Sequence, residues 1–314
     1  MAVIHRRDEY YSVDIINCRR KNLPRHALHN QHKGWRGRMG LKIETISKVF
    51  VGTGDYETDN KVVYQPFARS NGKLVIPGTC IKGVVRTYAE ALSPSCEGGK
   101  CRVEKDGICI CCSIFGALGF QGRVSFCDTE PLESTGVTLD KYSMKVRRSG
   151  GFTGRRRFYY HNKPGNYRAV DKGTGNFKPR DEERVEVVSR DTHFVCDLFF
   201  KNFTQKELGL LLLAMGCSPD HPFFPKLGGG KNRLLGSIRI SLPEEIRFAS
   251  PNFYSNFAIS YDVKGLNDWG RSAVAMYMAS LDDDQRDKVL DNIRAFQTDA
   301  EPATETPEEQ AHGK

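Results

Sequence analysis

The stretch THFVCDLFFKNFTQKELGLLLLAM, residues 192–215, runs from a strand directly into a helix. Its first half contains the aromatic and β-branched residues that favour strands. Thr204 and Glu207 then have the spacing of a capping box, in which each side chain accepts a hydrogen bond from the other residue's backbone N–H. The apolar residues that follow predict a helix beginning next to Thr204.

A second strand-to-helix pattern precedes this one in the chain. In MGLKIETISKVFVG, residues 39–52, alternating side chains are typical of a half-buried strand. A helix is expected over 79–92, with Thr79 as its cap, and further strands over 122–128 and 234–242. The order strand–helix–strand therefore occurs twice, which indicates an α+β domain of the ferredoxin-like class.

The composition is that of a globular protein. Of the 314 residues, 39% are hydrophobic and 27% are charged, which excludes a fully disordered chain. The longest apolar run, residues 208–215, is far shorter than the roughly 20 residues a membrane span needs. The charged start MAVIHRRDEYYS has no signal-peptide core. We therefore expect a cytoplasmic protein, without membrane partners, whose ten cysteines are reduced.

The positive charge is concentrated in residues 141–190. This glycine-rich segment holds 14 Lys and Arg against five Asp and Glu, a net charge of +9 that equals the charge of the whole chain. Arg155, Arg156 and Arg157 directly precede Phe158. Cations bind phosphates and aromatic rings stack on bases, so the segment favours single-stranded nucleic acid as a partner, with a solvated loop as the alternative.

Five cysteines lie within 17 residues. The spacing of Cys96, Cys101, Cys109 and Cys112 suits a Zn²⁺ ion with four thiolate ligands, and Cys111 competes with Cys112 for the fourth position. This insert has almost no large apolar residues, so metal binding would supply its folding energy. Four thiolates leave no open coordination position, which favours structural zinc over a catalytic metal, and free thiols are the alternative.

A glycine loop, Gly228–Gly230, precedes Lys231 and Arg233. Glycines let backbone N–H groups approach a phosphate, and the two cations add charge. The loop lacks the GK[ST] ending of a P-loop, so nucleotide hydrolysis is not expected, and a plain turn is the alternative reading.

Taken in order, several blocks of the sequence resemble the RAMP superfamily of CRISPR-associated proteins. They are VFVGTGDYE at 49–57, DNKVVYQPFARSNGKLVIPGTCIKGVVR at 59–86, CICCSIFGALGFQGRVSFCD at 109–128, DTHFVCDLFFKNFTQKELGLLLLAM at 191–215 and KLGGGKNRLLGSIRI at 226–240. The resemblance extends over roughly residues 40–245, and it is greatest to the backbone subunits of type III effector complexes.

The resemblance implies an RRM-like palm with an extended thumb and a zinc-binding insertion. The expected division is a basic N-terminal arm at 1–38, the palm at 39–250 with the zinc insert at 93–115 and the thumb at 141–190, a helical extension at 251–296 with a helix over Asp268–Phe296, and a disordered acidic tail at 297–314.

The resemblance also implies a subunit that binds guide CRISPR RNA. Its further partners would be a complementary target RNA and the other subunits of the complex. Lys82, Arg86, Lys231 and Arg233 would hold guide phosphates, and the Arg155–Phe158 stretch would belong to the thumb. An inactive structural or capping subunit of the same complex is an alternative.

Target cleavage is an open question at this stage. In target-cleaving members, a loop Asp supports metal-dependent attack of a 2′-OH on the adjacent phosphate. Asp59 matches this position, with Asp55 as the alternative, and Lys61 stands where many members have Pro. Mg²⁺ or another divalent ion would then join the structural zinc as a cofactor. A guide-processing ribonuclease would instead need a His base, for which His161 and His193 are the candidates.

Overall fold

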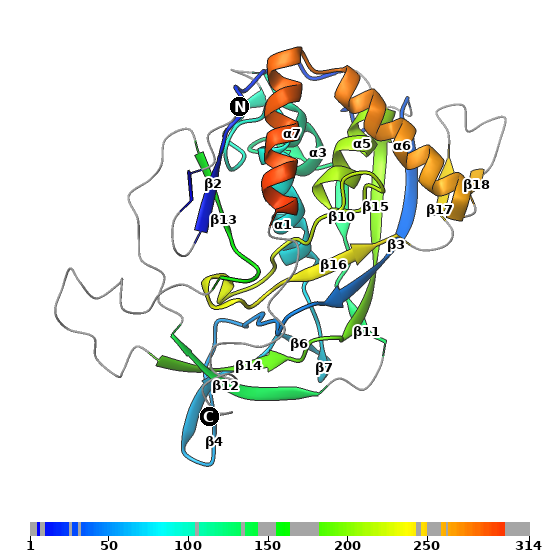
Figure 1. Ribbon diagram of the computed structural model, residues 1–314. Coiled ribbons are helices and arrows are strands. Elements are labelled where there is room, and N and C mark those ends of the chain that lie inside the picture. Colours follow the sequence, from blue (N-terminus) through cyan, green and yellow to red (C-terminus); the bar gives the residue numbers. More distant parts are fainter. Residues whose placement is uncertain are drawn as a thin grey trace.

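The computed structural model shown in Figure 1 describes residues 5–6, 10–24, 27–30, 33–103, 107–132, 136–143, 155–163, 182–242, 246–249, 259–261 and 263–298. Residues 144–154 and 164–181 of the expected thumb, and residues 299–314 of the expected tail, lie outside this set. Within it, no helix has both the length and the apolar character that crossing a membrane demands.

An antiparallel sheet forms the centre of the molecule. Strand β15 (His193–Phe203) lies between β10 (Val124–Phe126) and β3 (Trp35–Thr45). Strands β16 (Ile238–Ser241) and β17 (Ile246–Ala249) pair with successive parts of the other edge of β3. The main strands therefore lie in the spatial order β10-β15-β3-β16, all antiparallel to their neighbours.

Two helices connect these strands in the order that the sequence predicts. Along the chain, helix α1 (Gly78–Ala91) comes after β3 and before β10, and α5 (Gln205–Ala214) comes after β15 and before β16. The capping box is confirmed, because the Thr204 side chain accepts the Glu207 N–H and Glu207 accepts the Thr204 N–H. The molecule thus belongs to the mixed α+β class with antiparallel sheets.

The alternation along β3 explains where the core lies. Met39, Leu41 and Ile43 are buried, whereas Arg38 and Lys42 between them are exposed. The buried side chains join one hydrophobic cluster together with those of α1 and α5. One face of the sheet therefore carries the core and both helices, and the other carries charged side chains.

The C-terminal part differs from the prediction of one helix over Asp268–Phe296. The structure has two helices, α6 (Val263–Ala279) and α7 (Asp283–Gln297). The helical conformation stops before Asp282. The Asp282 side chain accepts the Gln285 N–H at 2.9 Å and so caps the start of α7. Trp269 and Phe296 of these helices are buried in the main core, so the extension packs on the palm itself.

The expected basic N-terminal arm, residues 1–38, contains paired strands. Strand β2 (Tyr10–Asp14) pairs antiparallel with β13 (Arg155–Tyr159), and β1 (His5–Arg6) pairs with β2. Figure 1 shows β2 and β13 side by side, next to α7. The central strand β3 also begins inside the expected arm, at Trp35.

A second sheet holds the ends of the expected thumb. Its strand order is β12 (Val137–Ser143), β14 (Glu182–Val188), β5 (Val62–Gln65) and β4 (Glu57–Asp59). The remaining short elements are β6 (Arg69–Ser70), β7 (Lys73–Leu74), α3 (Ile110–Phe115), β8 (Gly116–Ala117), β9 (Phe120–Gln121), β11 (Glu130–Pro131), the 3₁₀ helix η4 (Lys231–Arg233) and β18 (Ile259–Tyr261).

Candidate metal centre and nucleic-acid interface

Four buried cysteines meet beside the C-terminal half of α1. The sulfur atoms of Cys96, Cys101, Cys109 and Cys112 all lie within 4.8 Å of one another. Cys96 Sγ is 3.3 Å from that of Cys112, 3.6 Å from that of Cys101 and 3.7 Å from that of Cys109. Four thiolates around a tetrahedral zinc ion would be about 3.8 Å apart, given a Zn–S bond of about 2.3 Å. The cluster therefore fits a metal ion such as zinc.

The conformation of α3 shows which of the adjacent residues Cys111 and Cys112 joins the cluster. Cys109 is its N-cap, and the Cys112 N–H donates to the Cys109 side chain, which brings these two residues together. Cys111 faces elsewhere, with its sulfur 3.3 Å from the Ser93 hydroxyl oxygen. The structure thus brings together the four cysteines that the spacing predicts and leaves Cys111 outside the cluster.

The hydrogen bonds inside the cluster favour a thiolate at one position. Donation from the Cys112 side chain and backbone lowers the pKa of Cys109, against the opposing effect of burial. The same side-chain hydrogen bond, together with burial, raises the pKa of Cys112. A metal ion takes thiolates as ligands, so a cluster that already stabilises one thiolate suits metal binding.

Arg86 lies against the metal-binding insert. Its Nη2 is 3.6 Å from Cys112 Sγ, its Nη1 donates to the Gly116 carbonyl oxygen at 3.1 Å, and its Nε donates to Glu90 Oε1 at 2.7 Å. All three guanidinium nitrogens thus have protein partners. Lys82, one turn earlier on α1, is half-buried on the same side, and burial lowers its pKa. The two residues share one side of the helix, as their spacing predicts.

A separate cleft of about 420 Å³ lies between α1, the glycine loop and β13. Arg157, Lys226 and Lys231 line it, and none of the described residues in its lining is acidic. The glycine loop takes part because it lies tightly against the chain after β3. Gly228 has a φ of +81°, and a Cβ there would lie 2.0 Å from the Phe50 carbonyl oxygen. Three cations from two segments, β13 and the glycine loop, therefore line one concave surface.

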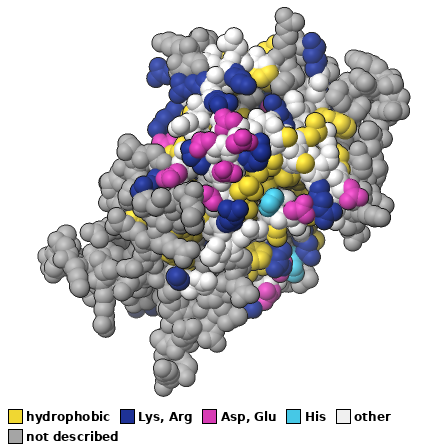
Figure 2. Space-filling view, turned by 45° about the horizontal axis from the view of Figure 1, so that its top comes forward, with side chains coloured by type: hydrophobic (Ala, Val, Ile, Leu, Met, Phe, Trp, Pro, Cys, Tyr) yellow, Lys and Arg dark blue, Asp and Glu magenta, His cyan; other side chains and the backbone are white. Residues whose placement is uncertain are grey.

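Burial shapes the charge in this cleft. It lowers the pKa of Lys231, whose backbone oxygen accepts a hydrogen bond from Lys226 Nζ at 3.2 Å. Figure 2, by contrast, shows a face on which the described Lys and Arg side chains lie among Asp and Glu side chains. Charges of one sign thus gather in the cleft, whereas on that face the two signs are mixed.

The three adjacent arginines of β13 have different environments, because successive side chains of a strand point to opposite faces. Arg155 donates to Asp14 at 3.1 Å. Arg156 forms an ion pair with buried Glu90. The Arg157 guanidinium lies 4.1 Å from the centre of the Tyr10 ring and lines the cleft. Of the three, the structure places Arg157 alone in the cleft lining.

Two other predicted RNA contacts are buried. Phe158 is 4% exposed and packs against Tyr88 and Phe296, with ring centres 4.9 Å and 4.7 Å away. One edge of Phe158 reaches the cleft, although its ring belongs to the core. Arg233 is 5% exposed in η4, so Lys231 is the residue of this pair that reaches the cleft.

Asp59 lies on an exposed hairpin away from the cysteine cluster. It ends β4 and is paired with Val62 across a two-residue turn, in which Asn60 and Lys61 have φ angles of 46° and 69°. Proline is locked near −65°, so the Pro that the resemblance implies at this position cannot occupy the backbone seen at Lys61. Asp55, also exposed, donates its backbone N–H to the Thr53 hydroxyl at 3.2 Å.

The described residues contain one group of three or more side chains that could hold a metal ion, the cysteine cluster. Neither Asp59 nor Asp55 belongs to it. The histidine candidates are also placed: His161 is 2% exposed, with Nδ1 2.7 Å from the Ser237 hydroxyl oxygen, and His193 begins β15. His161 is therefore enclosed in the core.

These features together define an α+β protein with a cysteine cluster that could hold a metal ion and a cleft lined by cations. A family model, that of the RAMP superfamily, matches residues 42–239. The chain belongs to this superfamily, which suggests an RNA-binding role in a CRISPR effector. A search of curated proteins finds no match. The matched region agrees with the extent of the resemblance in the sequence.

Sequence reasoning missed two residues of these sites. Glu90 accepts hydrogen bonds from both Arg86 and Arg156, and the only signal for it was the four-residue spacing from Arg86 on one helix. Lys226, at the start of the glycine loop, lines the cleft with Lys231. Its signal was present in the same quoted block, KLGGGKNR.

Proposed function

We infer that this chain is a guide-RNA-binding subunit of a type III CRISPR effector complex. The observation that carries the proposal is the convergence of Arg157, Lys226 and Lys231 on one cleft, in whose lining the described part of the chain places no carboxylate. RNA phosphates would supply the missing negative charge. Superfamily membership supports RNA over other polyanions.

The cleft suits a single strand. Lys231 and Arg157 would contact successive phosphates, and the backbone of Gly228 and Gly229 lets a phosphate approach closely. Tyr159, which also lines the cleft, offers a ring on which a base can stack. Lys82 would hold a further phosphate at the edge of the metal-binding insert.

The other residues that the sequence predicts as RNA contacts would hold the walls of the cleft in position without touching RNA. Arg86, Arg156 and Phe158 have protein partners and hold α1, the insert and β13 together. Arg233, 5% exposed, would fix the glycine loop. On this proposal their substitution weakens RNA binding through the shape of the cleft, whereas substitution of Lys231 removes a phosphate contact.

The architecture supports the finer assignment of the palm as ferredoxin-like and RRM-like. The order β3-α1-β10-β15-α5-β16, with β15 inserted between β3 and β10, is a split βαβ arrangement. Residues 141–190 would form the thumb, and the described ends of this segment belong to β12, β13 and β14. Complementary target RNA and other subunits of a cytoplasmic complex are the further partners we propose.

Zinc is the metal we propose for the cysteine cluster, because four thiolates at tetrahedral spacing are typical of structural zinc. The ion would cross-link the two halves of the insert. All four positions are taken by protein sulfur, so the site would serve folding and leave chemistry on RNA to other residues.

Target cleavage is proposed for Asp59, with Asp55 as the alternative. Both side chains are exposed next to the β4–β5 hairpin, where a bound strand can reach them. A single carboxylate holds Mg²⁺ weakly, so phosphate oxygens of the RNA would complete the ion's ligands. The 2′-OH would lose its proton to solvent and attack the adjacent phosphate, and the bond to the 5′-oxygen of the next nucleotide would break, which leaves a 2′,3′-cyclic phosphate and a 5′-OH. The neighbouring base must be displaced to permit this in-line geometry.

The test of the RNA-binding proposal is the salt dependence of affinity. The zinc-loaded chain should bind a single-stranded RNA of mixed sequence, and log affinity should fall with log salt at about 0.7 per phosphate contacted. RNAs of unrelated sequence should bind alike. Affinity that is sequence-specific, or that is flat with salt, would contradict the proposal.

A further inference from the structure

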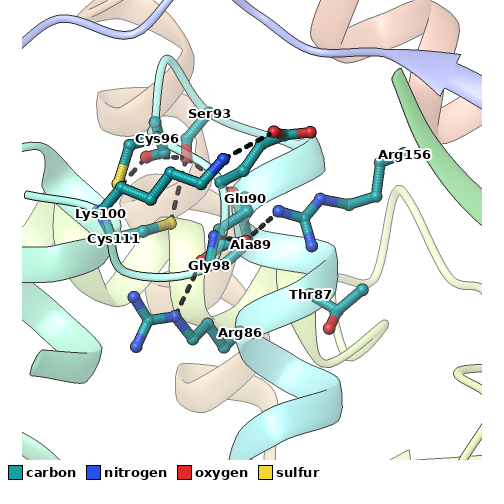
Figure 3. Close-up of polar contacts among 12 residues, drawn as sticks. Arg86, Thr87, Ala89, Glu90, Ser93, Cys96, Gly98, Lys100, Cys111 and Arg156 are labelled. Carbon is teal, nitrogen blue, oxygen red and sulfur yellow. Dashed lines mark hydrogen bonds and ion pairs between the residues drawn. The ribbon is translucent and has the colours of Figure 1, made fainter. Parts of the chain in front are cut away.

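Glu90 joins three separate parts of the molecule. Its carboxylate, 2% exposed, accepts hydrogen bonds from Arg86 Nε of its own helix at 2.7 Å and from the Gly98 N–H of the metal-binding insert at 3.1 Å. Arg156 Nη2 of β13 donates to its second oxygen. Figure 3 shows the Glu90 side chain between Arg86 and Arg156, with Gly98 beside it.

The first of these links reaches the metal centre. Arg86 also lies 3.6 Å from the sulfur of Cys112, and Gly99 leaves room for it: a Cβ there would lie 2.8 Å from Arg86 Nη2. A zinc ion with four thiolates carries a net charge of −2, which would attract this guanidinium. Metal binding therefore favours the position of Arg86 in which it also holds Glu90.

The second link reaches the cleft. The Arg156 side chain is 17% exposed and forms an ion pair with Glu90. The next residue of β13, Arg157, lines the cleft. Arg156 and Arg157 are neighbours in the ladder of β13 with β2, opposite Val13 and Ser12, so a displacement of one shifts the other. A buried carboxylate that loses one partner is strongly destabilised, so Glu90 keeps Arg156 and the insert in register.

We propose that Glu90 is a positioning residue that couples metal binding in the insert to RNA binding in the cleft. The coupling runs from Cys112 through Arg86, Glu90 and Arg156 to Arg157. It rests on the proposed function, since it assumes that the cleft binds RNA. Such coupling is reciprocal: if bound metal tightens RNA binding, bound RNA tightens metal binding by the same factor.

Reciprocity supplies a readout other than activity. The dissociation constant for Zn²⁺ is measured on the full chain against a competing chelator, without and with a saturating single-stranded RNA. In the wild type, RNA should lower this constant roughly tenfold, a typical coupling between sites. In Glu90→Gln, which keeps the size of the side chain and removes its charge, RNA should leave the zinc affinity unchanged.

Glu97→Gln is the matched control. It removes the same charge from the insert, but Glu97 pairs with Lys100 at the surface, 3.3 Å away. The roughly tenfold effect of RNA should persist in this variant. Persistence of that effect in Glu90→Gln as well, or its absence in a wild type that binds RNA, would overturn the coupling.

Two further measurements keep the outcome unambiguous. Direct titration of RNA on the zinc-loaded wild type tests the proposed function separately. Absence of RNA binding refutes the proposed function and the coupling. RNA binding that leaves the zinc affinity unchanged refutes only the coupling. If melting curves show that Glu90→Gln is unfolded, Arg156→Gln breaks the same path from the strand side. It should likewise abolish the effect of RNA on zinc affinity.

Discussion

Arg123 and Glu207 form an ion pair in the interior of the molecule. The Arg123 side chain is 0% exposed and that of Glu207 is 5% exposed. Arg123 also donates to the carbonyl oxygens of Ser113 and Asn202, at 2.8 Å and 2.5 Å. Glu207 also completes the capping box with Thr204 at the start of α5. The pair therefore fastens the end of the cysteine insert to the second half of the domain.

Removing one partner of this pair should be costly. Glu207→Ala leaves the Arg123 guanidinium buried without its anion, so we expect a loss of about 3–5 kcal/mol in the free energy of unfolding. Urea denaturation measures it. The control is Glu44→Ala, whose partner Arg239 is 49% exposed, with an expected change below about 1 kcal/mol. Equal losses in the two variants would contradict the assignment.

The two adjacent cysteines should behave differently on substitution. Cys112→Ser removes a ligand, and zinc content should fall well below one ion per chain. Cys111→Ser changes a sulfur whose neighbour is Ser93, so the purified protein should keep one zinc. Elemental analysis of both proteins, purified without chelator, provides the measurement. The reverse pattern would place Cys111 in the site.

The cleft cations should each carry a measurable share of RNA binding. Lys231→Ala and Arg157→Ala should each weaken affinity and reduce the salt slope by about 0.7, which corresponds to one phosphate contact with a single strand. Fluorescence anisotropy at several salt concentrations gives both values. Lys288→Ala on α7, where the lysine pairs with Asp284, should change neither the affinity nor the slope. Unchanged slopes for Lys231 and Arg157 would remove the cleft from the interface.

Cleavage of a guide-complementary RNA by the assembled complex with Mg²⁺ tests Asp59. In Asp59→Ala the rate should fall by roughly 100-fold or more, as on loss of a catalytic group, while target binding is kept. Asp55→Ala should cut at nearly the wild-type rate. If instead Asp55→Ala loses cleavage and Asp59→Ala does not, the catalytic role belongs to Asp55. Binding without cleavage by the wild type would identify a scaffold subunit.

The stability of the fold should fall in acid because of His161. Burial, and next the charge of Lys226, lower the pKa of His161 well below its usual value of 6.5. Between pH 6.5 and that lower pKa, the unfolded chain takes up a proton that the folded chain does not. Stability is therefore complete above pH 6.5 and is lost below it, by about 1.4 kcal/mol per pH unit. In His161→Gln, urea denaturation between pH 5 and 7 should show a weaker dependence.

Local patterns were sufficient to predict the main strands and helices of the mixed α+β fold. Alternation predicts β3, which starts at Trp35, four residues before the expected position, and the capping box predicts the start of α5 at Gln205. Both signals arise within a few residues and do not depend on distant parts of the chain. The pairing of β2 with β13 was missed because it joins Asp14 to Arg155, 141 residues apart.

The candidate site residues also fall into two groups, those that local spacing predicts and those that depend on contacts between distant parts of the chain. The cysteine spacing predicted the four residues that the structure brings together, because cysteines on short turns follow local rules. Arg155, Arg156 and Arg157 look equivalent in the sequence, yet Arg156 is paired with Glu90. Only the tertiary structure shows that Arg156 contacts a buried carboxylate and that its neighbour Arg157 lines a cleft. Likewise, the positive φ at Lys61 follows from hairpin geometry that composition does not reveal.

The pairing of β2 has a consequence for the order of events during synthesis. A ribosome releases residues 10–14 long before their partner strand, residues 155–159, has been made, and the Asn292 side chain that donates to the Asp14 carbonyl oxygen emerges later still. Strand β2 must therefore wait while the central sheet assembles. Contacts this distant along a chain close slowly, which makes docking of β2 a late step of folding.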